Sequence, residues 1–339
     1  MRTRVGINGM GRVGREVLRV TRRHYDRAFE VVAVNDRMPV QTLAHLIRHD
    51  APSGGRPGRV EVGRTVMTVD GSPLRVFTET DPSALPWAEL GVDVVIEATG
   101  EFAARERAAA HLAAGARKVV LAGPGPDADV TVAIGINDDD YEASTHNVIG
   151  HVGCAANCLA PMIAVLHRCY GVRQGMVTVV HGNLVDAHQP DDLHRDLGSA
   201  REPRMSLIPA TTGAIRSIER VLPDLAGRLG GRALRVPMAD ASIIDLTVQF
   251  DDALTPGQVN RAFSEAAGGW LKSVLRYSTE PLVSSDVIGD PASCVFDGGL
   301  TSTSGTMANV SGWFDNRSGH AHRTVELVDL VCRTLPERS

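Results

Sequence analysis

The sequence predicts an α/β protein of two domains, in which an N-terminal doubly wound parallel sheet is followed by an α+β domain with a mixed or antiparallel sheet. Three observations support this prediction. Apolar strand-like runs alternate with helical patterns over residues 1–152, as in a parallel sheet with helical crossovers. A glycine-rich turn joins the first run to the first helical pattern. After residue 153 the strand-like runs become longer, with fewer helices between them.

The first half begins with a pattern typical of a right-handed βαβ unit. Residues 3–8 form an apolar run, residues 11–21 a helical pattern and residues 30–35 a second apolar run. Alternating runs at residues 59–69 and 73–77 then flank an Asp-Gly pair, which predicts an antiparallel hairpin. The alternation of strands and helices resumes at residues 92–97, 103–114, 118–122 and 130–135.

The second domain is expected at residues 153–320. Residues 154–170 have the composition of a helix, but Pro161 lies inside it, so we expect a bend or a turn just upstream. Long strands are predicted at residues 172–181, 241–250 and 300–307, and helices at residues 255–267 and 321–334. The last helix is apolar enough to pack back on the first domain.

Composition limits the class of protein. A chain of 339 residues with 43% hydrophobic residues can fill two cores. The net charge of -5 gives no basic field for nucleic acid, and no apolar run reaches the ~20 residues that a membrane-spanning helix needs. With five cysteines we expect no disulfide framework, and since Met1 leads into a predicted strand without a charged and apolar leader pattern, we expect no secretory signal. These features favour a cytoplasmic location and a small-molecule partner.

A nucleotide-binding fingerprint lies between the first strand and the first helix. Gly9, Gly11 and Gly14 have the Gly-x-Gly-x-x-Gly spacing that allows a tight turn, close approach of a pyrophosphate and helix packing. Asp36 follows Gly14 at about the ~20-residue spacing of a ribose-binding carboxylate, which favours NAD. Arg37 could instead meet a 2'-phosphate, so NADP remains an alternative.

Cys154 is the candidate nucleophile, because it stands at the start of a predicted helix. A helix N-terminus or a nearby imidazolium lowers the pKa of a thiol from its ordinary ~8.5. His181, at the end of a predicted strand, is the candidate base. The alternative interpretation is an inert buried cysteine and a histidine that is merely satisfied at a strand end, and Cys158 is expected to serve only in packing.

Several blocks of the chain resemble the phosphorylating glyceraldehyde-3-phosphate dehydrogenases and their erythrose-phosphate relatives. These blocks are residues 7–14, 35–36, 97–100, 154–161, 235–237, 284–286 and 313–316. The resemblance implies a Rossmann domain, a catalytic domain whose sheet packs across subunits, and a homotetramer. It also implies that Cys154 is the nucleophile, His181 the base, Arg235 a ligand for the substrate anion and Asn316 the partner of the nicotinamide amide.

The fingerprint and the resemblance together give the expected cofactor-binding residues. They are Asn8, Gly9, Met10, Gly11, Arg12, Val13, Gly14, Asp36, Arg37, Thr99, Gly100 and Asn316.

The sequence departs from the family where the family binds anions. A serine and a threonine normally flank the catalytic cysteine, whereas this chain has Gly153 and Ala155. Asp186 stands where a phosphate ligand would be expected, and a carboxylate repels phosphate. Thr212 and Gly213 still resemble the turn that holds the substrate anion in the family. We therefore expect weaker phosphate binding, so that water or another nucleophile could release the product.

The resemblance implies an NAD(P)-dependent aldehyde oxidoreductase without a metal. In it, Cys154 forms a thiohemiacetal that loses a hydride to the nicotinamide and becomes a thioester. The substrate is glyceraldehyde 3-phosphate or a related small phosphorylated, phosphonylated or polar aldehyde. Two alternatives remain: a cofactor-binding regulatory or scaffold protein with weakened catalysis, and an inhibitor-tolerant duplicate of the housekeeping enzyme.

Overall fold

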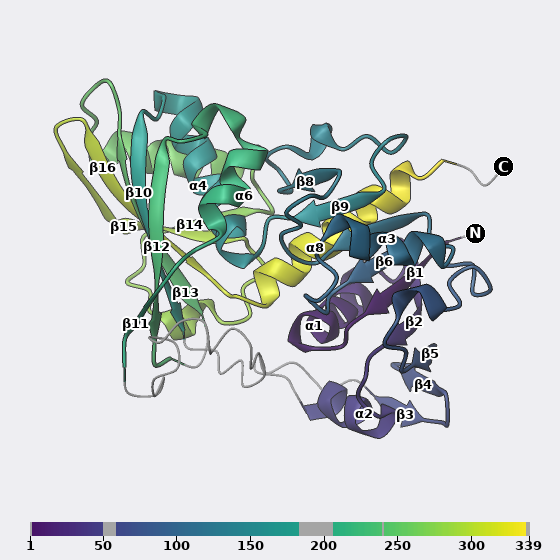
Figure 1. Ribbon diagram of the computed structural model, residues 1–339. Coiled ribbons are helices and arrows are strands. Elements are labelled where there is room, and N and C mark those ends of the chain that lie inside the picture. Colours follow the sequence, from purple (N-terminus) through teal and green to yellow (C-terminus); the bar gives the residue numbers. More distant parts are fainter. Residues whose placement is uncertain (1, 50–58, 183–205, 239–240, 337–339) are drawn as a thin grey trace. The chain divides into compact units, whose positions relative to one another are not determined.

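The computed structural model describes residues 2–49, 59–182, 206–238 and 241–336. The chain divides into two compact units (Figure 1). The first unit consists of Met1–Val152 together with Ala321–Ser339, and the second consists of Gly153–His320.

The first unit contains a sheet with the strand order β3-β4-β5-β2-β1-β6-β7-β9-β8. Its central pairs, β1 with β2 and β1 with β6, are parallel, whereas β3, β4 and β5 form an antiparallel edge. The strands are β1 (Thr3–Asn8), β2 (Phe29–Asn35), β3 (Val60–Val62), β4 (Val66–Val69), β5 (Ser72–Phe77), β6 (Val94–Glu97), β7 (Lys118–Leu121), β8 (Val130–Val132) and β9 (Val148–His151).

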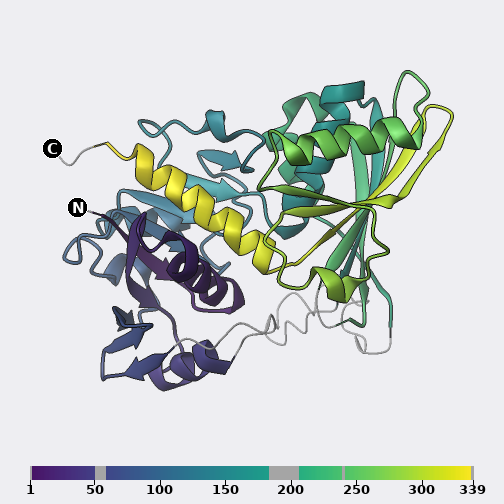
Figure 2. The ribbon, with the colours of Figure 1, turned by 180° about the vertical axis from the view of Figure 1, so that it is seen from behind.

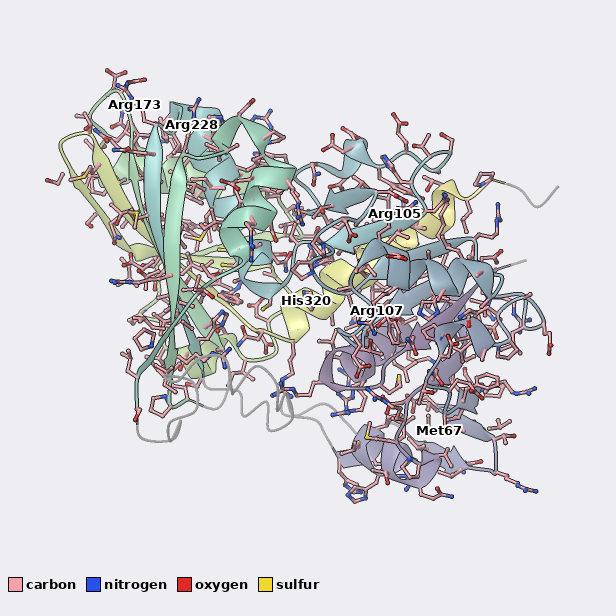
Figure 3. The ribbon with its side chains drawn as sticks, viewed as in Figure 1. Met67, Arg105, Arg107, Arg173, Arg228 and His320 are labelled. Carbon is pink, nitrogen blue, oxygen red and sulfur yellow. The ribbon has the colours of Figure 1, made fainter. Side chains whose placement is uncertain are left out.

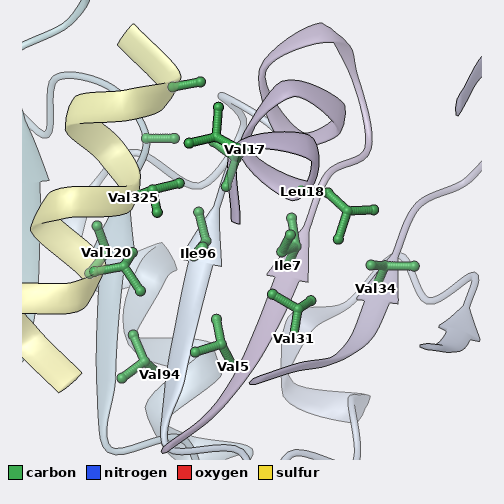
Figure 4. Packing of buried hydrophobic residues seen from close by; sticks show 14 of the residues in the cluster. Val5, Ile7, Val17, Leu18, Val31, Val34, Val94, Ile96, Val120 and Val325 are labelled. Atoms are coloured by element: carbon green, nitrogen blue, oxygen red, sulfur yellow. The ribbon is translucent and has the colours of Figure 1, made fainter. Parts of the chain in front are cut away.

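The core of the first unit forms between the sheet and its helices. Val5 and Ile7 of β1 lie in one buried cluster with Val17 of α1 and Val325 of α8 (Figure 4). Alternation in the strands and helical spacing in α1 turn these apolar side chains to one side. The helices are α1 (Arg12–Val20), α2 (Val40–His49), α3 (Arg105–Ala113) and the part of α8 (Ser318–Thr334) from Ala321 on, with the short turns η1 (Thr21–Tyr25), η2 (Pro82–Ala84) and η3 (Asp138–Asp140).

The predicted hairpin is confirmed at Asp70 and Gly71, which join β4 to β5. Both residues have positive φ, 51° and 85°, as the tightest hairpin turns require. The single run predicted at residues 59–69 is instead two strands, β3 and β4, because the chain reverses where Gly63 N donates to Val66 O at 2.8 Å. β9 was not predicted.

The second unit contains a sheet with the strand order β11-β12-β10-β13-β16-β15-β14. Two of its pairs are parallel, β10 with β12 and β14 with β15, and the others are antiparallel. The predicted mixed sheet, and with it the fold class, is confirmed. The strands are β10 (Gln174–Gly182), β11 (Ile208–Ala210), β12 (Leu229–Val236), β13 (Ser242–Gln249), β14 (Leu275–Ser278), β15 (Cys294–Ser304) and β16 (Met307–Phe314).

Helices cover one face of this sheet (Figures 1 and 2). They are α4 (Cys154–Tyr170), α6 (Ala214–Val221) and α7 (Pro256–Gly268), with the short turns η4 (Pro223–Leu225) and η5 (Ser284–Val287). α4 runs unbroken through Pro161. A proline inside a helix costs roughly 3 kcal/mol, and the burial of every side chain from Ala155 to Leu166 offsets this cost.

The strand predicted at residues 300–307 is wrong. This segment contains the end of β15, a turn at Gly305 with φ 58°, and the first residue of β16. The error arose because threonine and serine favour strands on both sides of a turn whose glycine is the only local signal. β11, β12, β14 and α6 were not predicted.

Candidate active site

The glycine turn of the first unit is shaped by contacts that exclude side chains. Gly9 has φ +93°, and a Cβ there would lie 2.6 Å from Thr99 N. A Cβ on Gly14 would lie 2.0 Å from Gly9 O, so this glycine lets α1 pack against the turn. A Cβ on Gly11 would have no atom within 4 Å. Gly11 therefore faces open space before α1, where a pyrophosphate fits the helix N-terminus.

Asp36 follows β2 and is fixed by the backbone of the same turn. Its Oδ2 accepts from Met10 N at 2.6 Å, and its Oδ1 accepts from Met38 N at 2.9 Å. Asp36, Arg37 and Thr99 line a cavity of about 190 Å³. The Arg37 guanidinium is paired with Glu101, and the carboxylates around the cavity oppose a 2'-phosphate.

A buried hydrogen-bond network supports the wall of this cavity. Asn8 Nδ2 donates to Glu97 Oε2 at 2.6 Å, and Glu97 Oε1 accepts from Thr99 N at 2.7 Å. Behind Glu97, His111 Nε2 lies 3.0 Å from Oε2, and Trp87 Nε1 donates to His111 Nδ1 at 3.0 Å. Sequence reasoning missed His111 and Trp87, because no local pattern shows that they meet in three dimensions.

The other residues predicted for cofactor binding contribute mainly backbone or packing. The Met10 side chain is fully buried in the core, so only its backbone can face a ligand. Val13 packs against the same core. Arg12 is half-buried in the first turn of α1, and Gly100 is exposed with φ +75°.

In the second unit, Cys154 is the first residue of α4 and is half-buried. Gly153 precedes it with φ +84°, a conformation that favours glycine. Burial raises the pKa of the Cys158 thiol, which is also raised by its contact with Cys294. Partial desolvation raises the pKa of Cys169 as well, although this residue is exposed. These thiols are disfavoured as thiolates, so Cys154 is the better candidate for a nucleophile.

His181 lies near the carboxyl end of β10, between two neighbouring strands. Arg235 of β12 and Ser242 of β13 are its partners in register. His181 Nδ1 lies 3.0 Å from Ser242 Oγ, and Ser242 Oγ donates to Asn316 Oδ1 at 3.0 Å. The Phe314 ring meets the imidazole edge-on at 5.9 Å. Arg173 and Arg228, labelled in Figure 3, lie just before β10 and β12, at the end of these strands opposite to His181.

The surroundings of His181 favour its neutral form. Burial lowers the pKa of His181 below 6.5, the Arg235 guanidinium lowers this pKa further, and the Asn316 side chain acts in the opposite direction. A neutral imidazole can accept a proton at pH 7. The described contacts of His181 do not include Cys154, so their pairing stays a prediction.

The residues predicted to bind the substrate anion are only partly brought together. Arg235 is exposed and adjacent to His181. Thr212 Oγ1 accepts from Ala214 N at 3.2 Å, and Gly213 is the N-cap of α6. The register of β11 places Ile208, not Thr212, opposite Arg235.

Gly153 and Ala155, which flank Cys154 where the resemblance leads us to expect hydroxyl side chains, supply no hydrogen-bond donor from their side chains. Ala155 is buried and has only a methyl group, and Gly153 has no side chain. Asp186 lies outside the described residues.

Asn316 and Ser242 complete the candidate site. Asn316 is only 5% exposed, and its Nδ2 is a buried donor without a partner among the described residues. An amide donor of this kind fits the carboxamide oxygen of a nicotinamide ring. Ser242 is fully buried and was missed by sequence reasoning, since only the register of β10 and β13 places it beside His181.

Comparisons with known proteins match a family model to each of the two units. Residues 3–105 match the family model described as "Glyceraldehyde 3-phosphate dehydrogenase, NAD binding domain". Residues 153–316 match the model described as "Glyceraldehyde 3-phosphate dehydrogenase, C-terminal domain". Together with the fold, these matches define the class as NAD-dependent oxidoreductases.

The similarity to curated proteins extends over the whole chain. The chain is 43% identical to glyceraldehyde-3-phosphate dehydrogenase 2 of Streptomyces arenae, over 99% of this chain and 100% of that protein. It is 44% identical to glyceraldehyde-3-phosphate dehydrogenase of Geobacillus stearothermophilus, over 98% of both chains. The chain belongs to the glyceraldehyde-3-phosphate dehydrogenase family, which confirms the predicted family, and NAD is its cofactor.

The described residues also lack two features. None of their helices has the length and apolar character needed to cross a membrane. Within the same residues, no group of three or more His, Cys, Asp and Glu side chains could hold a metal ion.

Proposed function

We propose that this protein oxidises a small phosphorylated aldehyde, with glyceraldehyde 3-phosphate as the first candidate, through a thioester on Cys154. In this proposal the first unit is the NAD-binding domain and the second the catalytic domain. The observation that carries it is a half-buried thiol at the start of α4 in the same unit as a hydrogen-bonded His181, whose surroundings lower its pKa. The names of the full-length relatives supply the substrate class.

The chemistry begins at the thiol of Cys154. His181 takes the Sγ proton as the sulfur attacks the aldehyde carbon, which becomes the carbon of a thiohemiacetal. The Cys154 backbone N–H and the imidazolium of His181 are the proposed donors to the oxyanion. The imidazolium returns its proton to the oxyanion, which becomes the hydroxyl of the thiohemiacetal. The neutral His181 then accepts that hydroxyl proton while the same carbon loses a hydride and becomes a thioester. Bound NAD supplies the acceptor for that hydride.

Arg235 is the proposed ligand of the substrate anion. Its exposed guanidinium stands beside His181 in register, so a phosphate held there would keep the aldehyde near the base. Thr212 and Gly213 are proposed to help at the start of α6, where backbone N–H groups attract anions.

Release of the acid requires an acceptor that attacks the thioester. A bound phosphate would lack two hydroxyl donors, because Gly153 and Ala155 stand where the resemblance leads us to expect a serine and a threonine. A charge-assisted hydrogen bond is worth roughly 1.5–3 kcal/mol. We therefore propose that phosphate binds weakly and that water or another nucleophile can compete with it.

NAD is proposed to be preferred over NADP. Asp36 and Glu101 place two carboxylates at the cavity of the first unit, and Glu101 holds the Arg37 guanidinium. A 2'-phosphate would be repelled by the carboxylates and would have to displace this ion pair.

The protein is also proposed to act in the cytoplasm as a homotetramer. Its five cysteines are all free thiols, as in a reducing compartment. One face of the second unit's sheet exposes Met176, with Thr247 and Asn309 partly exposed beside it, which suits a contact between subunits.

The test is reduction of NAD measured by absorbance over a panel of phosphorylated and unphosphorylated aldehydes, with and without phosphate. The expected result is turnover with a phosphorylated aldehyde, and its loss in Cys154→Ala. Cys169→Ala is the matched control, because Cys169 is exposed at the far end of α4. Tight NAD binding without even a single turnover would favour a regulatory or scaffold protein instead.

The third alternative, an inhibitor-tolerant duplicate, is separated by an inactivation assay. The wild-type protein and Ala155→Thr, which restores one hydroxyl beside Cys154, are exposed to a thiol-directed inhibitor. Faster inactivation of Ala155→Thr, at equal turnover of glyceraldehyde 3-phosphate, would favour that alternative.

A further inference from the structure

The hydrogen bonds around His181 determine which of its nitrogens carries the proton. Ser242 Oγ donates its only proton to Asn316 Oδ1, at 3.0 Å. The same oxygen lies 3.0 Å from His181 Nδ1 and can therefore only accept there. The neutral imidazole then carries its proton on Nδ1, and the lone pair is on Nε2.

We propose that Ser242 is a positioning residue that, together with Asn316, holds His181 as the Nδ1–H tautomer and so keeps Nε2 available as the base. This inference rests on the proposed function, in which His181 takes a proton. The same two hydrogen bonds, from His181 to Ser242 and from Ser242 to Asn316, also fit the imidazolium, since Nδ1–H donates to Ser242 in both protonation states. Protonation of His181 then requires no rearrangement of its partners.

The orientation of the Asn316 amide determines in which direction the hydrogen bonds between Asn316, Ser242 and His181 are donated. If Nδ2 rather than Oδ1 faced Ser242, the serine would accept from Asn316 and donate to His181 Nδ1. The lone pair would then be at Nδ1, where Ser242 blocks it. In the structure Nδ2 is the buried donor without a described partner, and a carboxamide oxygen that accepts from it would hold the productive orientation.

The backbone before Ser242 is held in a strained conformation. Ala241 has φ 65°, in the left-handed region that residues other than glycine rarely adopt. Ala241 is fully buried, and its O accepts from Gly182 N at 3.2 Å. Such strain persists only where the surroundings fix it. Here the burial of Ala241 and its hydrogen bond from Gly182 hold the start of β13 beside His181, and Ser242 is the next residue.

The experiment is nitrogen NMR of protein labelled with ¹⁵N-histidine, without NAD or aldehyde, at a pH where His181 is neutral. The His181 signals are assigned by their absence in His181→Asn. The wild-type protein is expected to show a protonated Nδ1 and a bare Nε2. Ser242→Ala is expected to lose this preference, and Ser242→Thr, which keeps the hydroxyl, to retain it. Ser278→Ala is the control, since it removes another buried hydroxyl, which accepts from Glu280 N.

A second readout is the alkylation rate of Cys154 by iodoacetamide, followed on its peptide. Loss of a single hydrogen bond predicts a decrease of about tenfold in Ser242→Ala and none in Ser278→Ala. A wild-type His181 protonated on Nε2, or a Ser242→Ala protein with an unchanged tautomer, would overturn the inference. Failure of the proposed function is a separate result, because it would show either as no turnover of any aldehyde or as aldehyde oxidation that survives Cys154→Ala.

Discussion

At the scale of single residues, the candidate site depends on how the environment of His181 sets its charge. Burial and the Arg235 guanidinium both lower the pKa of His181. Burial disfavours the charged imidazolium, and a neighbouring positive charge repels it. Arg235 therefore has two roles in the proposal, because it attracts the substrate anion and also keeps the base neutral.

Replacing Arg235 should separate these two roles. Arg235→Gln removes the positive charge, so the pKa of His181 should rise toward 6.5 while burial still holds it lower. The limb of the pH–rate profile that reports deprotonation of His181 should move to higher pH. Proton NMR titration of His181 measures this pKa directly. Arg232→Gln, on the same strand but paired with Thr178, is the control and should not change it.

The nature of the chemical groups was readable from single residues, but their arrangement was not. Cys154 and the fingerprint glycines stand at local positions, a helix start and a turn, that a sequence pattern can indicate. Ser242 has no local signal, because its role depends on the antiparallel register of β13 against β10. The absence of hydroxyls at Gly153 and Ala155 was visible in the sequence, whereas the positive φ of Gly153 was not.

At the scale of elements, the turn between β1 and α1 separates two uses of glycine. A Cβ on Gly14 would collide with Gly9 O at 2.0 Å, whereas a Cβ on Gly11 would meet no protein atom within 4 Å. Gly14 is therefore required by the packing of the helix, and Gly11 leaves space that the protein itself does not use.

Two matched variants test this distinction. Gly14→Ala should lower the thermal midpoint, because backbone atoms must move to admit the methyl group. Gly11→Ala should leave the thermal midpoint unchanged and weaken NAD binding in calorimetry, since its methyl group would occupy the space of the pyrophosphate. Equal NAD affinity for Gly11→Ala and the wild-type protein would contradict the placement of the pyrophosphate at this turn.

Elements with strong periodicity were predicted well, and elements that depend on distant partners were not. The start of α7 was predicted at Thr255, which is its N-cap and forms a capping box with Gln258. The hairpin at Asp70 and Gly71 carried an equally local signal. β12 was missed because Gly230 and Gly231 interrupt its pattern, and its pairing with β10 and β11 makes it a strand.

At the scale of the whole molecule, the two sheets differ in how many of their faces are buried. In the first unit, the residues of β1 from Val5 to Asn8 are buried on both faces of the sheet. In the second unit, Met176 of β10 is 64% exposed, whereas the next residue, Val177, is 1% exposed. Alternation of this kind places the helices on one face and leaves Met176, beside the polar Thr247 and Asn309, on the other.

The open face of the second sheet should therefore support assembly. Met176→Lys adds a charge that would be buried without a partner in a subunit contact, which is strongly unfavourable. Size-exclusion chromatography with light scattering should show a smaller species than the wild-type protein. Arg173→Lys, at an exposed residue just before β10, is the control and should assemble normally. An unchanged mass for Met176→Lys would place the subunit contact elsewhere.

The central claim is that His181 activates Cys154, and the most direct measurement is the rate of Cys154 alkylation in His181→Asn at pH 7, without NAD. A positioned base contributes at least about a hundredfold to proton transfer. The account predicts that the alkylation rate falls by about that factor, while the thermal midpoint stays near that of the wild-type protein. Equal alkylation rates in His181→Asn and the wild-type protein would show that Cys154 and His181 do not act together.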